Sequence, residues 1–243
     1  MNEVLCRRKS KIRFLRLAQN FIEMLTYPCI KIRLHGSNQE KLYRYVTKRH
    51  PRYWLFQNKK WGAALLRFPE DFGSYYQGTG RNMVRSGCNR ALKLGFVARC
   101  FDPLEYLDDI FAINQSTISR QNRPMDPSYT TMDKIVKFIK EENRDWFGVF
   151  NNRVELRAYL CYEICGEIAF LIRTLGHFND LEDGIMKLLF TEVIRNLVLE
   201  KQSRDLQWFM YGTFPGASEG LRFFKRYLGF KPYNVKWLHT DEN

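Results

Sequence analysis

Long hydrophobic runs are missing from this 243-residue sequence. No window holds the ~18 apolar residues that a transmembrane helix needs. Lys and Arg also interrupt the N-terminus too often for the apolar core of a secretion signal. We therefore expect a cytoplasmic location, with peripheral contact to a membrane surface as a further option.

Paired cysteine motifs are missing as well. The sequence has six cysteines and no CxxC pair. Cys161 and Cys165 lie four residues apart with no nearby His, which gives a zinc site poor support. No Cys or Ser has the sequence context of a covalent nucleophile. We therefore expect free thiols in a reducing compartment and no metal cofactor.

Acidic residues are scarce in the first quarter of the chain. Residues 1–60 carry fifteen Lys and Arg against three acids, a net charge of +12, whereas the remaining residues carry twenty-four against twenty-three, a net charge of +1. Attraction to a polyanion therefore belongs to residues 1–60. RNA and an anionic membrane surface are the candidate partners, and a solvated basic helix face is the alternative.

The apolar content is high enough for a sizeable core, at 45% hydrophobic residues. Apolar periodicity and turn signals predict a series of elements along the chain. These are helices at 4–26 and 38–48; a hairpin of 52–57 and 61–68; helix 79–94; strand 96–101; helices 103–118 and 131–142; strands 146–150, 154–164 and 167–174; helix 184–201; strand 206–211; helix 218–228; and strand 233–238.

This order predicts an α/β (α+β) fold with a mixed, mostly antiparallel central sheet and helices on both faces. Strands 167–174 and 206–211 are joined by a helix, so they are expected to be parallel neighbours that splay apart at their carboxyl ends. We place a basic N-terminal helical extension at residues 1–50 and the main domain at residues 51–243.

The last predicted helix ends in Phe224-Lys225-Arg226-Tyr227-Leu228-Gly229-Phe230, where the glycine can stop the helix and the phenylalanine returns to the core. This ending resembles that of the GNAT acyltransferase superfamily. Lys225, together with the Arg81-x-x-x-Arg85 and Lys93-x-Gly95 motifs, resembles the Fem-type branch, which includes aminoacyl-tRNA-dependent peptidyl transferases and related acetyltransferase-like proteins. The resemblance covers roughly residues 60–238.

The resemblance implies three catalytic candidates. The Lys225 ammonium would stabilise the oxyanion that forms during acyl transfer. Tyr211, at the end of strand 206–211, would donate a proton to the leaving group. His177 follows strand 167–174 and would deprotonate the attacking amine, with Glu163 and Glu167 as rival bases.

Binding groups are expected in three further places. A row of cations on helix 79–94 can hold a phosphate or carboxylate, and polar residues of the following helix and loop can orient an acceptor. The start of helix 184–201 can bind an anion through its backbone N–H groups. The predicted substrate-binding residues are Arg81, Arg85, Ser116, Arg120, Gln121, Tyr129 and Arg173, and the predicted cofactor-binding residues are Gly184, Ile185 and Phe224.

Together these observations predict an acyltransferase that moves an acetyl, longer acyl or aminoacyl group from a thioester or ester donor to an amine by direct attack in a ternary complex. The donor is acyl-CoA, an acyl-carrier protein or an aminoacyl-tRNA. The alternative is a non-catalytic domain of the same fold that binds RNA or an anionic surface through its basic N-terminus.

Overall fold

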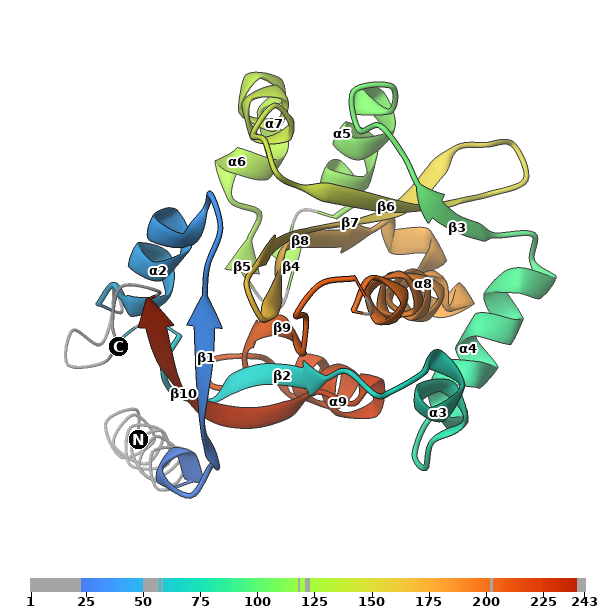
Figure 1. The fold of residues 1–243 in the computed structure, drawn as a ribbon. Helices are drawn as coiled ribbons and strands as arrows, with labels where there is room; N and C mark the ends of the chain where they lie inside the picture. Colours follow the sequence, from blue (N-terminus) through green and yellow to red (C-terminus); the bar gives the residue numbers. More distant parts are fainter. Residues whose placement is uncertain are drawn as a thin grey trace, which may run out of the picture.

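The structure is a computed structural model that describes residues 23–49, 57, 59–117, 119–120, 123–201 and 203–239. Within these residues, an eight-stranded sheet forms the centre of the fold (Figure 1). Its strands are β1 (Cys29–Leu34), β2 (Ala63–Arg67), β3 (Val97–Cys100), β6 (Asp145–Phe150), β7 (Leu156–Cys165), β8 (Ile168–Gly176), β9 (Trp208–Thr213) and β10 (Lys231–His239). A separate short hairpin pairs β4 (Ser119–Arg120) with β5 (Arg123–Pro124).

The strand order is β1-β10-β2-β9-β8-β7-β6-β3. Neighbours are antiparallel except for two parallel pairs, β1 with β10 and β8 with β9. The predicted mixed, mostly antiparallel sheet is therefore confirmed.

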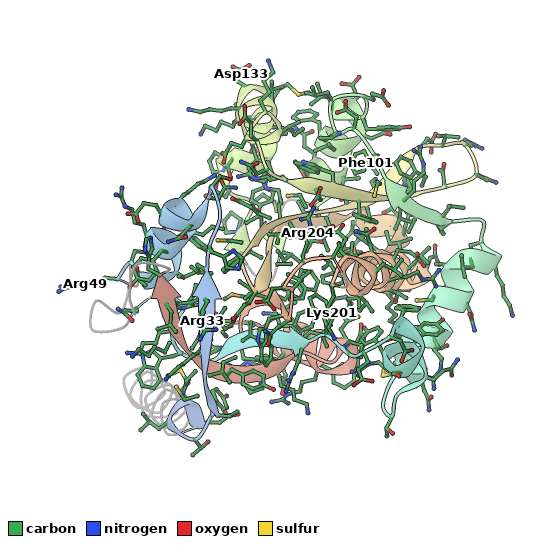
Figure 2. All side chains as sticks on the ribbon, viewed as in Figure 1. Arg33, Arg49, Phe101, Asp133, Lys201 and Arg204 are labelled. Atoms are coloured by element: carbon green, nitrogen blue, oxygen red, sulfur yellow. The ribbon has the colours of Figure 1, made fainter. Side chains whose placement is uncertain are left out.

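Helices cover both faces of the sheet, as predicted (Figure 1). They are α2 (Gln39–Thr47), α3 (Phe72–Gln77), α4 (Asn82–Lys93), α5 (Leu107–Gln115), α6 (Pro127–Thr130), α7 (Met132–Ile139), α8 (Ile185–Glu200) and α9 (Glu219–Leu228), with a 3-10 helix η1 (Phe178–Asp183) before α8. One core cluster joins α3, α4, α8 and α9 to one face. On the opposite face, α2 packs over β1 and β10, and α5 and α7 pack over β6 and β7. Apolar side chains fill the space between these layers, whereas charged residues such as Arg49 and Asp133 lie at the periphery (Figure 2).

Strands β8 and β9 separate before they end. They pair in parallel only from Ile168 opposite Trp208 to Phe170 opposite Met210, although β8 continues to Gly176 and β9 to Thr213. On its other edge, β8 inserts one extra residue, Ile172, between its pairings with β7. Such a bulge increases local twist and turns a strand away from its neighbour. Helix α8 connects the two strands, so the predicted splayed parallel pair is confirmed.

Two predicted regions differ from the structure. Residues 29–34, for which no helix or strand was predicted, form β1, which pairs with β10 in the main sheet. The helix predicted from residue 103 begins at Leu107, because residues 103–106 form turns. Helix α3, the β4–β5 hairpin and α6 were not predicted. The N-terminal helix and the 52–57 strand fall largely on residues outside the described ranges. None of the described helices is long and apolar enough to cross a membrane.

Candidate functional site

Lys225 is a buried cation at the point where β9 ends. Its side chain extends from α9, its residue is 3% exposed, and Nζ donates a 2.8 Å hydrogen bond to the carbonyl of Thr213. Nζ also lies 4.7 Å from the centroid of the Tyr211 ring. Burial lowers the pKa of Lys225 to about 7, with smaller contributions from the positive charges of Lys59 and Arg222. The ammonium therefore faces the end of β9 instead of bulk solvent.

Helix α9 brings Lys225 to this position. Ser218 caps the helix by accepting from the Leu221 N–H at 3.3 Å, and Gly229 ends it with a φ of 97°. A side chain at Gly229 would also collide with the guanidinium of Arg81, since a Cβ there would lie 2.1 Å from Nη2. The glycine that carried the sequence resemblance is thus needed for its positive φ, and any larger residue would also have to displace the end of the Arg81 side chain.

Tyr211 forms the wall beside Lys225. Its ring packs against the apolar core, with centroids 5.0 Å from Phe190 and 5.8 Å from Phe230. Burial raises the pKa of its hydroxyl, and the phenol groups of Tyr227 and Tyr129 raise it further. The hydroxyl therefore keeps its proton at neutral pH and remains able to donate it.

Arg173 lies on the β8 side of the divergence and is 7% exposed. Its guanidinium carbon lies 3.6 Å from the centroid of the Phe138 ring and 3.9 Å from that of Tyr129. Nη1 is 3.5 Å from the Ser128 carbonyl, a long hydrogen bond. The helices α6 and α7, which follow the β4–β5 hairpin, supply all three of these contacts.

A buried hydrogen-bond chain fixes the position of Tyr129. Asn114 is fully buried and donates from Nδ2 to the Tyr129 carbonyl at 2.8 Å. Its Oδ1 accepts from the Tyr159 hydroxyl at 2.7 Å. Tyr129 contacts Arg173 on β8, whereas Lys225 contacts Tyr211 on β9. The structure thus places one pair of side chains at each of the two strands that diverge.

His177 lies apart from this group, in a polar cluster at the end of β8. The Arg157 Nη2 atom lies 3.1 Å from His177 Nδ1, and Arg157 Nε is 2.7 Å from the Asp180 carboxylate. The Asp180 carboxylate also lies 3.6 Å from the same Nδ1 atom, so Nδ1 has a donor and an acceptor beside it. Ser116 lies nearby and accepts from the Phe178 N–H at 3.0 Å, which joins α5 to η1.

The rival carboxylates differ in their surroundings. Glu167 accepts from the Arg33 N–H at 3.2 Å and forms an ion pair with the same residue. Glu163 is 1% exposed, its Oε1 has no partner within the described part of the chain, and burial raises its pKa. A raised pKa makes a carboxylate a stronger base. Glu163 and Glu167 therefore stay candidate bases beside His177.

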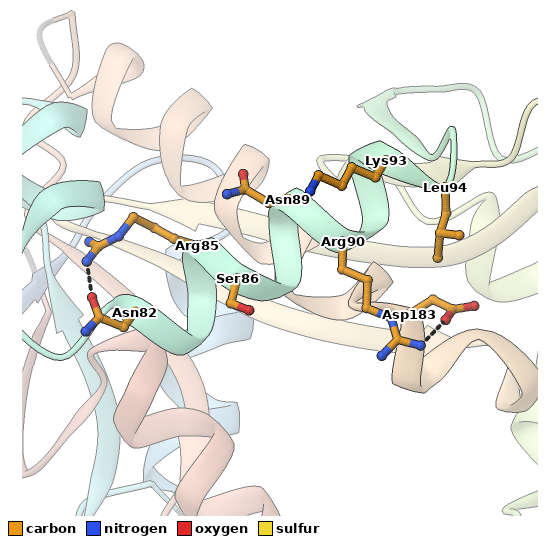
Figure 3. Close-up of a pocket in the computed structure, with 8 residues that line it drawn as sticks. All are labelled: Asn82, Arg85, Ser86, Asn89, Arg90, Lys93, Leu94 and Asp183. Carbon is orange, nitrogen blue, oxygen red and sulfur yellow. Dashed lines mark hydrogen bonds and ion pairs between the residues drawn. The ribbon is translucent and has the colours of Figure 1, made fainter.

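Arg81 and Arg85 both donate to backbone carbonyls. Arg81 Nη1 donates to the Tyr227 carbonyl at 3.0 Å, which ties α4 to α9. Arg85 Nη1 donates to the Tyr76 carbonyl at 2.6 Å, and its Nη2 donates to Asn82. A groove with a volume of about 790 Å³ runs along the same helix. Figure 3 shows its basic residues Arg85, Arg90 and Lys93, with Arg90 turned toward Asp183 at 2.9 Å.

The start of α8 packs against α4. Gly184 has a φ of 87°, and a Cβ there would lie 2.2 Å from the carbonyl oxygen of Gly87. Ile185 is fully buried in the core. Phe224 likewise packs inward, with its ring centroid 5.5 Å from Phe190. These three residues, predicted to hold a cofactor, contact the core and α4 in this structure.

For two of the predicted substrate-binding residues, the structure does not describe the side chain. Gln121 is outside the described residues, and only the backbone of Arg120 is described, in β4. Within the described part of the chain, no group of three His, Cys, Asp or Glu side chains could hold a metal ion.

The fold can be compared with solved structures. FemX aligns with a TM-score of 0.50 and 11% identity, over 71% of this chain and 59% of FemX. The fold is therefore GNAT-like and similar to that of FemX. A conserved protein of unknown function from Bacteroides thetaiotaomicron aligns with a TM-score of 0.52 and 12% identity, over 71% of this chain and 56% of that one. The L-PGS from Bacillus licheniformis aligns with a TM-score of 0.49 and 15% identity, over 70% of this chain and 58% of that one.

At these identities the comparisons show the fold alone. The chain spans well under two thirds of the length of these structures. No family model matches the sequence, and no curated protein matches it.

Sequence reasoning missed two residues that shape the site. Asn114 and Phe138 lie on predicted helices, where they read as an ordinary polar and an ordinary core position. The sequence contains one indication for Asn114. It is a polar residue next to Ile113 on the apolar face of an amphipathic helix, and a buried polar residue usually forms a hydrogen bond. Phe138 carried none, since its role depends on the distant Arg173.

Proposed function

We propose that this protein is an acyltransferase that moves an acyl group from an ester or thioester donor to an amine at the divergence of β8 and β9. The observation that carries the proposal is the buried Lys225 ammonium, which lies over the Tyr211 ring where β9 separates from β8. The name of FemX and the Fem-type resemblance of Phe224-Lys225 point to the same class of reaction.

Each group then has a defined task. The amine of the acceptor attacks the donor carbonyl, and the carbonyl oxygen becomes an oxyanion. The Lys225 ammonium stabilises that charge in a water-poor setting, where a hydrogen bond to an ion is strong. The Tyr211 hydroxyl gives its proton to the leaving oxygen or sulfur, and one of the candidate bases His177, Glu163 and Glu167 accepts the proton that the amine loses.

The charges around Lys225 favour a donor that carries phosphate. Lys59 and Arg222 both act on the Lys225 ammonium, and Arg222 lines a small pocket with Arg226. The lining of this pocket thus has two arginines and one acidic residue, Glu23. CoA, the prosthetic group of an acyl-carrier protein and the end of a tRNA all carry phosphate, so all three donors remain in the proposal.

The first test is donor binding and turnover. Acetyl-CoA, an acylated carrier protein and an aminoacyl-tRNA are each tested by thermal shift, since a ligand at about 100 times its Kd adds about 2.7 kcal/mol of stability. Labelled acyl transfer to an amine mixture then measures turnover. We expect Lys225→Met to keep donor binding and lower turnover about 100-fold or more. Absence of both binding and transfer with all three donors would reject the proposal.

The pH profile tests the role of Lys225. If the ammonium is the active form, turnover falls as pH rises through about 7, where Lys225 loses its proton. If the neutral amine acts as a base instead, turnover rises through the same pH. A profile that falls only in the wild type, and not in Lys225→Arg, supports the oxyanion role.

A further inference from the structure

Arg173 is a buried cation that forms no ion pair with any carboxylate among the described residues. Within the described part of the chain, no carboxylate lies within 4.0 Å of its guanidinium. Burying a charge without a counter-ion is costly, and proteins usually pair such groups. Two acidic residues, Asp126 and Glu163, have to be considered as counter-ions of Arg173.

The first of these acids is Asp126. Its side chain is exposed and caps α6 by accepting from the Ser128 N–H at 2.8 Å. That hydrogen bond is the main reason why the pKa of Asp126 is lowered, and Arg173 contributes least. The second is Glu163, on which Lys41 and Arg144 act as the nearby positive charges. Neither carboxylate therefore neutralises Arg173.

The stacking of Arg173 leaves the edge of its guanidinium for a ligand. The rings of Tyr129 and Phe138 contact its flat faces, at 3.9 and 3.6 Å from the guanidinium carbon. One in-plane nitrogen, Nη1, is directed to the Ser128 carbonyl at 3.5 Å. The remaining in-plane N–H groups have the fork geometry that binds a planar anion with two hydrogen bonds.

The surrounding residues hold this arrangement rigidly. Tyr129 is fixed through its carbonyl by Asn114, which is in turn bonded to Tyr159. Phe138 is contacted by a second guanidinium, that of Arg144, at 4.1 Å. Arg144 differs from Arg173 because it forms an ion pair with Glu141. Two stacked arginines thus share one ring, and only one of them has a carboxylate partner.

We propose that Arg173 binds a carboxylate group of the acceptor, so that the substrate is an amine that also carries a carboxylate, such as an amino acid or a short peptide. The single positive charge and the planar fork of N–H groups match one planar carboxylate better than a tetrahedral phosphate dianion. The identification of this ligand as the acyl acceptor rests on the proposed acyl-transfer function. The binding of a carboxylate at Arg173 does not depend on that function.

The test is equilibrium binding to the protein without a donor. Thermal shift and calorimetry are measured with amino acids and glycyl dipeptides, with the amides of the same compounds, and with phosphoethanolamine. We expect at least one amino acid or peptide to stabilise the protein, and its amide to bind about tenfold more weakly or not at all, because the amide lacks the charge. Phosphoethanolamine distinguishes a general anion site from a carboxylate site.

Variants connect that binding to Arg173. Arg173→Met should abolish the difference between acid and amide, and Arg173→Lys should weaken carboxylate binding because a lysine lacks the planar fork. The matched control is Arg195→Met, which removes an arginine that stacks on Phe72 and pairs with Glu192. It should leave the acid–amide difference unchanged. If Arg173→Met fails to fold, the wild-type acid–amide comparison and Arg173→Lys still decide.

Three results would overturn the proposal: equal binding of acids and amides, binding of phosphoethanolamine alone, or an unchanged acid–amide difference in Arg173→Lys and Arg173→Met. Acyl transfer to an amine without a carboxylate would leave the reaction class intact and remove only the substrate assignment. Carboxylate binding without any transfer would do the reverse, so the two proposals fail separately.

Discussion

Replacement of Lys225 by Met is expected to stabilise the protein at neutral pH. The folded state lowers the pKa of Lys225 from 10.5 to about 7, chiefly by burial. Retaining the ammonium in the folded state therefore costs about 5 kcal/mol at pH 7 and below. The Met side chain keeps the buried stem without the charge, although it loses the hydrogen bond to Thr213, which is worth about 1 kcal/mol.

The expected gain depends on pH in a defined direction. Between pH 7 and 10.5 the unfolded state holds the Lys225 proton and the folded state does not, so wild-type stability rises with pH through this window. Lys225→Met lacks this contribution. The stability difference between variant and wild type should thus be largest at and below pH 7, at about 4 kcal/mol, and should fall towards zero near pH 10.

Urea unfolding of both proteins at pH 6 to 10 measures this difference, and comparison at each pH cancels the other titrating groups. Lys201→Met is the control for losing a lysine-to-carbonyl hydrogen bond, because Lys201 is only half-buried and donates to the Pro69 carbonyl at 3.0 Å. A stability difference for Lys225→Met that stays flat across this range, or a variant less stable than wild type at pH 6, would refute the reasoning.

Two further substitutions test the supports of the site. Gly184→Ala should destabilise the protein by about 2 kcal/mol or more, because it combines a positive φ with a Cβ that would meet the α4 backbone. Gly80 also has a positive φ but has open space around it, so Gly80→Ala should lose only about 1 kcal/mol of stability in chemical denaturation. Equal losses for the two variants would show that the close approach of α4 to Gly184 does not contribute. Asn114→Ala should cost about 2–4 kcal/mol in the same assay, since it leaves the Tyr159 hydroxyl and the Tyr129 carbonyl unpaired, and a loss below about 1 kcal/mol would show that water replaces the amide.

The order of the main-sheet strands and of the longer helices from residue 61 onwards could be predicted because periodicity is local. Helix α8 is the clearest case, since its buried positions recur at helical spacing from Ile185 to Val198. Strand β1 was missed, although Ile30, Ile32 and Leu34 alternate with charged residues. That alternation is the signature of a half-buried strand. Its partner β10 lies some 200 positions away, so only the short pattern itself could have identified it.

The candidate site could be predicted only where a local motif carried it. Lys225 followed from its place before Gly229 and Phe230, and the structure places it at the strand divergence. Arg81, which was predicted to bind substrate, donates to the Tyr227 carbonyl in the last turn of α9, a contact that the sequence did not indicate. Helical spacing tells which residues share a surface and not which helix packs there. The same limit hid the contact between Arg173 and Phe138.

The two unbalanced cations bear on why this site exists. Lys225 and Arg173 are each buried, and within the described part of the chain neither forms an ion pair with a carboxylate. Stability alone would favour apolar side chains of similar volume at both positions. They lie instead on the two sides of one strand divergence, close to the phenols of Tyr211 and Tyr129. Under the two proposals, Lys225 faces a developing oxyanion and Arg173 faces a substrate carboxylate. Each ligand would offset the free-energy cost of burying the cation that it contacts, as expected where stability is exchanged for activity.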